Sequence, residues 1–145
     1  MFIKQISVFL ENKPGAMREL TAVLGSGGID IREISIADTQ AFGIVRIILR
    51  SEVIDQAMAL LKGAGYTARI NHVICAEIVD KPNGLCELLT VIEKENLSVE
   101  YIYSFRRTPA RGATMILRLS EQERACKVLK EYGVRVLTQE EADAL

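Results

Sequence analysis

Apolar residues along the chain follow two spacings in turn. They alternate with polar residues from Phe2 to Leu10, which predicts a strand. From Ala16 they recur every three or four residues until Ser26-Gly27-Gly28, which predicts a helix that stops at residues tolerating positive φ. The first half therefore reads strand, helix, strand, strand, helix, strand, over residues 2–10, 16–25, 29–36, 44–49, 51–62 and 66–70.

The second half repeats this order. Its elements are expected over residues 73–79, 85–95, 97–105, 113–119, 120–132 and 134–138. Ser120 with Glu123 three residues later is typical of a capping box at the start of the helix over 120–132. In the first half, the parity of the apolar positions changes between Ile31 and Ile34, which predicts a bulge or twist inside the 29–36 strand.

The amino-acid sequence itself repeats as well. Lys-Pro-Gly-Ala-Met-Arg-Glu-Leu at 13–20 corresponds to Lys-Pro-Asn-Gly-Leu-Cys-Glu-Leu at 81–88. A repeat of this length is one duplicated domain. We expect two domains, residues 1–71 and 72–145, with residues 139–145 as an acidic tail.

The repeated order predicts an α+β fold made of two ferredoxin-like βαββαβ domains. In each, two helices cover one face of an antiparallel sheet, and we expect the two sheets to lie side by side because only Asn71-His72 separates the copies. The strand after each first helix would lie at a sheet edge. Since open edges are a liability, we expect residues 29–36 and 97–105 to pair with each other or with a second chain, giving a homodimer or a continuous sheet.

Composition narrows the function classes. Hydrophobic residues make up 49% of the chain and charged residues 26%, which is typical of a globular protein. The formal net charge of −1 favours neither nucleic acid nor an anionic membrane as a partner. No apolar run reaches the length of a membrane span and no secretory signal is evident, so we expect a cytoplasmic protein.

Catalytic chemistry has no support in the sequence. There is no His with a neighbouring Ser or Cys, no paired-carboxylate motif and no phosphate-binding loop, so we expect no enzyme activity. Cys75, Cys86 and Cys126 are widely spaced, which favours buried thiols over a metal or redox site. The one histidine, His72, lies at the junction of the repeats. We expect no metal and no cofactor.

Two features of the second copy allow more than one interpretation. Tyr101, Tyr103 and Phe105 alternate along one strand, which favours an interdomain or dimer surface over the minor possibility of RNA stacking. The hairpin tip that follows is basic, and a solvated charged loop is favoured over an anion site. Its arginines are Arg106, Arg107 and Arg111.

The turn between first strand and first helix resembles a known family. Residues 10–17, Leu-Glu-Asn-Lys-Pro-Gly-Ala-Met, followed by Gly-Ile-Asp-Ile at 28–31, resemble the opening of an ACT domain, a small regulatory module that senses amino acids. Residues 79–85 and 96–99 resemble it more loosely. The resemblance implies a free-standing tandem ACT protein that binds an amino acid without catalysis. The first copy also resembles the start of acetolactate synthase regulatory subunits, so a docking subunit of a biosynthetic enzyme is the alternative.

The resemblance also implies a site. In this family the effector lies between two adjacent domains, against the strand-to-helix loop, where backbone N–H groups can hold a carboxylate. One site would join the 12–17 loop to Ser98 and Val99, and the other would join the 80–85 loop to Asp30 and Ile31. The expected ligand-binding residues are Asn12, Pro14, Gly15, Ala16, Met17, Asp30, Ile31, Asp80, Asn83, Gly84, Leu85, Ser98 and Val99.

Each of these residues also has a structural explanation. Pro14-Gly15 can be turn chemistry alone, and Asn12 and Asp80 can bond their own backbone. Asp30 and Ser98 can simply face solvent. Because Asn83 stands where the first copy has Gly15, either Gly84 carries the close approach to a ligand or the second site is vestigial. Apolar Leu10 favours an apolar effector.

Overall fold

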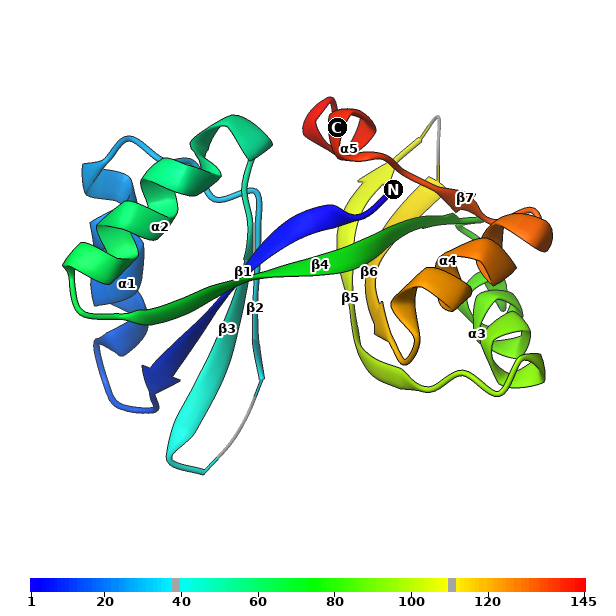
Figure 1. The fold of residues 1–145 in the computed structure, drawn as a ribbon, viewed down its shortest axis with the longest axis horizontal. Helices are drawn as coiled ribbons and strands as arrows, with labels where there is room; N and C mark the ends of the chain where they lie inside the picture. The colour runs from blue at the N-terminus through cyan, green and yellow to red at the C-terminus, as the bar shows by residue number, and fades with distance from the viewer. Residues whose placement is uncertain (38–39, 110–111) are drawn as a thin grey trace. The chain divides into compact units, whose positions relative to one another are not determined.

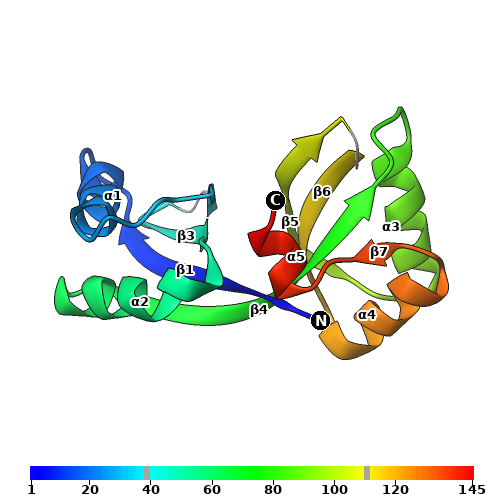
Figure 2. The same ribbon diagram turned by 90° about the horizontal axis from the view of Figure 1, so that it is seen from above.

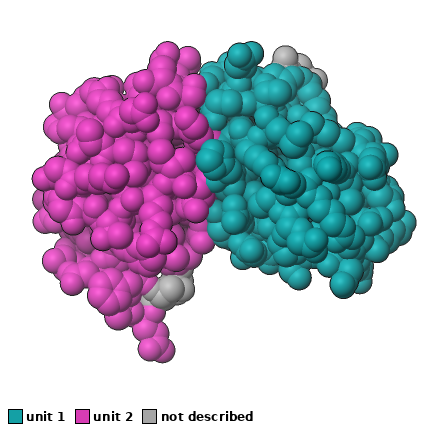
Figure 3. Space-filling model, in the orientation of Figure 1, with its two compact units in different colours: residues 1–3, 72–145 teal, residues 4–71 magenta. Residues whose placement is uncertain are grey.

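A computed structural model describes residues 1–37, 40–109 and 112–145 of the chain. These residues form two compact units (Figure 3). We call Lys4–Asn71 the first unit, which is unit 2 (magenta) in Figure 3, and His72–Leu145 together with Met1–Ile3 the second, which is unit 1 (teal). The domain boundaries at residues 1–71 and 72–145 stay a prediction. Arg111 of the predicted basic hairpin tip lies outside the described residues.

The first unit has the predicted order of elements (Figure 1). Its strands follow the order β2-β3-β1-β4, and the β1–β3 and β2–β3 pairs are antiparallel. The elements are β1 (Ile3–Glu11), α1 (Ala16–Ser26), β2 (Glu33–Ala37), β3 (Phe42–Ile48), a 3₁₀ turn (Ser51–Val53), α2 (Ile54–Gly63) and the start of β4 (Thr67–Ile78).

The second unit repeats this arrangement. Its sheet runs β5-β6-β4-β7, with all three of these pairs antiparallel. The elements are the rest of β4, α3 (Gly84–Lys94), β5 (Val99–Thr108), β6 (Gly112–Leu119), α4 (Gln122–Glu131), β7 (Arg135–Val136) and α5 (Gln139–Asp143). The predicted α+β class with two βαββαβ repeats is confirmed.

Each unit has its own core between its sheet and two helices. In the first unit, Ile6 and Val8 alternate along β1 and meet Leu20 of α1 and Leu61 of α2. In the second, Ile74 of β4 packs with α3 and α4 in the same way. Burial of these side chains follows the period of two in strands and of about 3.6 in helices, which is why the sequence pattern located the elements.

The predicted break between the copies is absent. β4 is one strand from Thr67 to Ile78 and passes through Asn71 and His72 without interruption. Asn71 can enter a turn, but no glycine or proline beside it enforces one, and the backbone stays extended.

Residues 29–32 are not a strand, contrary to the prediction. The Ile29 N–H donates to the Leu24 carbonyl at 3.1 Å, which closes the end of α1 after Gly28 adopts φ 70°. β2 begins at Glu33, where the alternation of apolar residues changes parity. The parity change marks the start of the strand rather than a bulge inside it.

The predicted capping box at Ser120 and Glu123 is also wrong. Glu121 takes the N-cap position of α4 with φ 51° and no side-chain cap, and the Ser120 hydroxyl instead accepts from the Ser98 N–H at 2.9 Å. A capping box does occur at Thr138 and Glu141. It starts α5, so the expected acidic tail is a helix, and this helix lies on the sheet face opposite α3 and α4 (Figure 2).

The predicted edge strands are at sheet edges and are not paired with each other in this chain. Among the described residues, β2 pairs only with β3 and β5 only with β6. Pairing of either edge with a second chain stays a prediction. Register shifts interrupt β5 between Val99 and Tyr101 and between Ser104 and Arg106. Tyr101 and Tyr103 stack at 6.5 Å, whereas Phe105 lies in the second shift and is 5% exposed, so the row is not one continuous aromatic surface.

Candidate functional site

The first strand-to-helix loop is built around Gly15. This residue is the N-cap of α1 and has φ 83°, a left-handed conformation that glycine adopts without cost. The Ala16 N–H donates to the Lys13 carbonyl at 3.2 Å, and the Lys13 N–H donates to the Glu11 carbonyl at 3.0 Å. Pro14 and Gly15 thus fold the chain through a tight turn into the helix.

The second loop reproduces this turn with different residues. Asn83 is the N-cap of α3 with φ 67°, and asparagine is among the few side chains that tolerate this region. The Gly84 N–H donates to the Lys81 carbonyl at 3.0 Å, as Ala16 does in the first loop. A Cβ at Gly84 would lie 2.1 Å from the Val79 carbonyl oxygen. Gly84 therefore lies too close to the Val79 backbone for any side chain, and its predicted approach to a ligand stays a prediction.

The free donors of the two loops lie at the helix N-termini. The N–H groups of Ala16 and Gly84 are already used inside the turns. Those of Gly15 and Met17 make no hydrogen bond to another described residue, since the first N–H groups of a helix have no intrahelical acceptor. These groups, with their counterparts in the second loop, are the donors available to an anion.

A cleft of about 280 Å³ lies beside the first loop. Its charged lining is Glu11, Lys13 and Glu19, and the Lys13 ammonium contacts the Glu11 carboxylate at 3.1 Å. That hydrogen bond and the negative charge of Glu11 raise the pKa of Lys13. The apolar and aromatic lining consists of Phe9, Leu10, Ala16, Phe42 and Tyr66.

A larger cleft, of about 580 Å³, lies beside the second loop. Its charged lining comes from the loop and from β5, and the Arg107 guanidinium binds the Asp80 carboxylate at 2.9 Å. The charged residues are Asp80, Lys81, Arg106 and Arg107. The apolar lining consists of Ile78, Val79, Leu85, Phe105, Ala113 and Met115.

The arginines of β5 were not predicted to lie at a site. Arg106 and Arg107 were expected in a solvated loop, and no spacing along the sequence brings Arg107 to Asp80, 27 positions earlier. The available signal was that the hairpin tip of the first copy, residues 37–43, has no Lys or Arg. Basic residues that occur in only one of the two copies indicate that the sites of the two copies differ in charge.

The predicted strand residues lie far from the loop of their own unit. Asp30 is exposed just beyond the C-terminal end of α1, and Gly15 lies at the other end of this 11-residue helix, about 16 Å away along its axis. Ile31 packs against the core of the first unit. Neither unit alone brings its 30–31 or 98–99 pair to its own loop, so the predicted ligand set stays a prediction that needs two domains.

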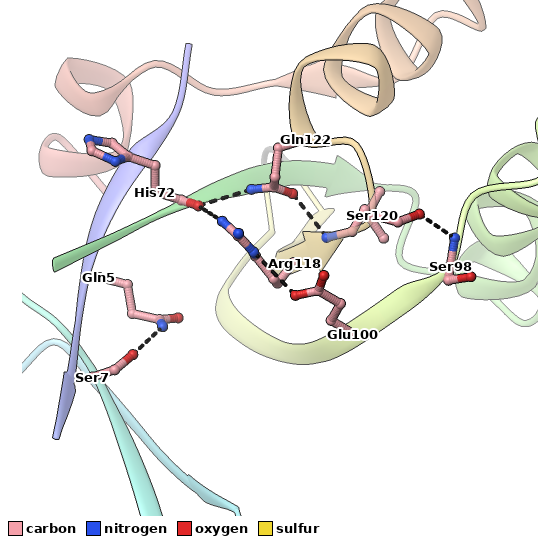
Figure 4. Close-up of polar contacts among 9 residues, drawn as sticks. Gln5, Ser7, His72, Ser98, Glu100, Arg118, Ser120 and Gln122 are labelled. Carbon is pink, nitrogen blue, oxygen red and sulfur yellow. Dashed lines mark hydrogen bonds and ion pairs between the residues drawn. The ribbon is translucent and has the colours of Figure 1, made fainter. Parts of the chain in front are cut away.

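Ser98 is held by backbone and hydroxyl contacts (Figure 4). It donates to the Ser120 hydroxyl and accepts from the Ser120 N–H, both at 2.9 Å, and Val99 beyond it is 38% exposed. Close by in the same unit, the His72 carbonyl accepts from Arg118 and from Gln122 at 2.9 Å. In the first unit, fully buried Gln5 donates to the Ser7 hydroxyl at 3.0 Å. The two hydrogen bonds with Ser120 hold the backbone at Ser98, and those of the His72 carbonyl join β4 to Arg118 of β6 and Gln122 of α4.

The cysteines differ in exposure. Burial raises the pKa of the Cys75 thiol to about 12, with Glu77 adding to the effect, and burial also raises the pKa of Cys126. Cys86 is exposed on α3, so the expectation that all three thiols are buried is wrong for this one. The described residues contain no group of three His, Cys, Asp or Glu side chains placed to hold a metal ion.

The comparisons with known proteins identify the family. A family model described as an ACT domain pair matches residues 1–144. The chain belongs to the ACT domain pair family. The resemblance seen in the sequence is therefore confirmed, and with it the pair of repeats.

Several solved structures resemble this ACT domain pair. The crystal structure of protein BT0572 from Bacteroides thetaiotaomicron is 32% identical, with a TM-score of 0.88, over 100% of this chain and 98% of that one. The ligand-free regulatory subunit of aspartate kinase from Thermus thermophilus is 14% identical, with a TM-score of 0.62, over 88% of this chain and 91% of that one. At this identity the second likeness is one of fold alone. No curated protein matches the chain.

Membership of the family supports a regulatory role based on ligand binding.

Among the described helices, none has the length and apolar character needed to cross a membrane.

Proposed function

We propose that this ACT domain pair is a non-catalytic regulatory protein whose effector is an amino acid. The observation that carries the proposal is the duplicated turn: Gly15 and Asn83 share one backbone conformation, and each stands beside a cleft. A feature needed only to start a helix could vary freely between two copies. Here the turn and the free N–H groups after it are kept although the residues differ.

The proposed ligand set follows from the chemistry of a zwitterion. The carboxylate would accept from the free N–H groups at the start of α1 or α3. The ammonium would be held by polar side chains, Asn12 with Ser98 at one site and Asp80 with Asp30 at the other. Because the two contributors from one unit lie at opposite ends of its first helix, we propose that each site is completed by a second ACT domain.

The proposed partner is an enzyme of amino-acid biosynthesis. The aspartate kinase regulatory subunit shares this fold over 91% of its own length, an example of the fold in a separate subunit. The second candidate function is a docking subunit such as that of acetolactate synthase, and the resemblance of the first copy to the start of such subunits supports it. A homodimer and a cytoplasmic location belong to the same proposal.

Thermal-shift measurements with each of the twenty amino acids test the proposal. A ligand that binds only the folded state at 100 times its Kd stabilises that state by about 2.7 kcal/mol, so a true effector raises Tm clearly. We expect Asp30→Ala to weaken the shift, whereas Asp55→Ala, an exposed Asp of α2 away from both loops, keeps it. If no amino acid raises Tm, effector binding is excluded. Co-purification with an enzyme would then favour the docking subunit.

A further inference from the structure

The two clefts have charged linings of opposite sign. The first contains two carboxylates and one ammonium, from Glu11, Glu19 and Lys13. The second contains one carboxylate and three cations, from Asp80, Lys81, Arg106 and Arg107. The whole chain has a formal net charge of only −1. This difference is therefore local, and it arises at equivalent places in the two copies.

A difference between ion pairs at equivalent positions explains why the lining of the first cleft is negatively charged. Lys13 and Lys81 correspond in the repeat, as do Glu19 and Glu87. Lys81 binds Glu87 at 2.9 Å, but Lys13 binds Glu11 instead, at 3.1 Å. Glu19 therefore has no ion pair with a described residue, and the first cleft keeps an unpaired carboxylate.

In the second cleft the unpaired group is a cation. Arg107 is occupied by Asp80 and Lys81 by Glu87. The Arg106 guanidinium lies 6.0 Å from the centre of the Phe105 ring and has no carboxylate partner among the described residues. A guanidinium remains charged at all ordinary pH values and presents a planar set of donors that fits a carboxylate. Phe105 supplies a ring face on which it can rest.

We propose that the second cleft is specialised for an acidic amino acid and that the first cleft disfavours one, an inference that rests on the proposed function. The neutral Arg107–Asp80 pair offers one cation and one anion to the two ends of a zwitterion. Arg106 offers a further cation to the side-chain carboxylate. In the first cleft the same ligand would meet the unpaired Glu19. The duplication has thus produced two sites with different ligand preferences.

Calorimetric titration with aspartate against asparagine, and glutamate against glutamine, tests this inference. Each pair differs in charge but hardly in size. A charge-assisted hydrogen bond to Arg106 should make the acid bind about tenfold more tightly than its amide. Raising the salt concentration should reduce this ratio, because the cleft is open to solvent and ions screen it.

Three variants assign the effect to its residue. Arg106→Gln should remove the preference for the acid, and Arg106→Lys, which keeps the charge but not the planar donors, should retain part of it. Arg50→Gln removes another exposed arginine without an ion pair, outside the second cleft, and should leave the preference unchanged. Unaltered circular dichroism of the three variants verifies that their folds are intact.

The outcomes separate this inference from the proposed function. Binding of neutral amino acids without any preference for the acids overturns the inference and leaves the proposed function standing. A preference that survives in Arg106→Gln also overturns it. Absence of binding by every amino acid overturns both.

Discussion

Gly15 and Asn83 stand at the same point of two equivalent turns and share a left-handed backbone, with φ of 83° and 67°. Each is the N-cap of the first helix of its unit, and neither helix has a side-chain cap at that end. The turn is therefore held by backbone conformation and backbone hydrogen bonds, without a side-chain cap. Substitutions at positions 15 and 83 should for this reason change the stability of the turn, which can be tested directly.

Gly15→Ala should lower the free energy of unfolding by about 1 kcal/mol, the cost of a left-handed conformation for a residue with a Cβ. No atom lies within 4 Å of the added methyl group, so backbone strain is the only cause. Gly15→Asn should cost less, because Asn83 already adopts this conformation. Urea unfolding measures both. Gly25→Ala, in the body of α1 and without a positive φ, should instead stabilise the protein by about 0.5–1 kcal/mol.

Gly84→Ala should be more damaging than Gly15→Ala, by a different mechanism. Its Cβ would lie 2.1 Å from the backbone oxygen of Val79, so the loop must move. We expect a loss of about 2–3 kcal/mol in urea unfolding, typical of forced overpacking. The reverse change at the equivalent position, Ala16→Gly, should cost about 1 kcal/mol. If Gly84→Ala and Gly15→Ala lowered the free energy of unfolding equally, the close contact of Gly84 with the Val79 backbone would be contradicted.

The thiols should react in a fixed order. Cys86 is exposed, whereas burial holds the pKa of Cys75 near 12 and also raises that of Cys126. Only thiolates react quickly with disulfide reagents. Titration of the native protein with such a reagent should therefore modify Cys86 rapidly and the other two only after unfolding. Cys86→Ser should abolish the fast phase, and a fast phase that remains would contradict the assigned burial.

The docking of α5 should depend on pH. The Thr138 N–H and the Arg135 guanidinium both donate to the Glu141 carboxylate, at 2.8 Å each, and hold its pKa below the ordinary 4.5. A lowered pKa means that the stabilisation is complete above pH 4.5 and is lost as the pH falls through the folded value. The protection factors of the α5 amides, which compare their exchange with that of an unstructured chain at the same pH, should fall below pH 4.5.

A matched variant separates the charge of Glu141 from its hydrogen bonds. Glu141→Gln keeps an acceptor for the Thr138 N–H but removes the charge, so the protection factors of its α5 amides should no longer change with pH in this range. Thr138→Ala removes the other half of the capping box and should cost about 1 kcal/mol. A pH response that persists in Glu141→Gln would show that another group controls α5.

The fold could be predicted because its evidence is local. Buried residues recur at every second position in a strand, as Ile6 and Val8 do, and about every fourth position in a helix, as Leu20 and Leu24 do. Both patterns can be recognised within a few neighbouring positions of the sequence. One prediction failed because of a partner distant in sequence. Ser120 was expected to cap α4, but its hydroxyl is taken by the Ser98 backbone, 22 residues away.

The candidate site was only partly predictable for the same reason. The loops at 12–17 and 80–85 were found because a helix start has a signature in sequence. The pairing of Asp80 with Arg107 depends on how β5 lies beside the loop, and the register shift after Ser104 changes the direction of the following side chains. No pattern in the sequence announces that shift.

The two register shifts of β5 also affect which strand edge of this protein is prone to aggregation at high concentration. An open strand edge invites other molecules to extend the sheet without limit, which leads to fibres. At each shift the spacing of amide and carbonyl groups is out of step with that of a regular incoming strand. β2 has no such interruption. Uncontrolled stacking of chains should therefore start at Glu33–Ala37, and this short segment is where a solubility-improving lysine belongs.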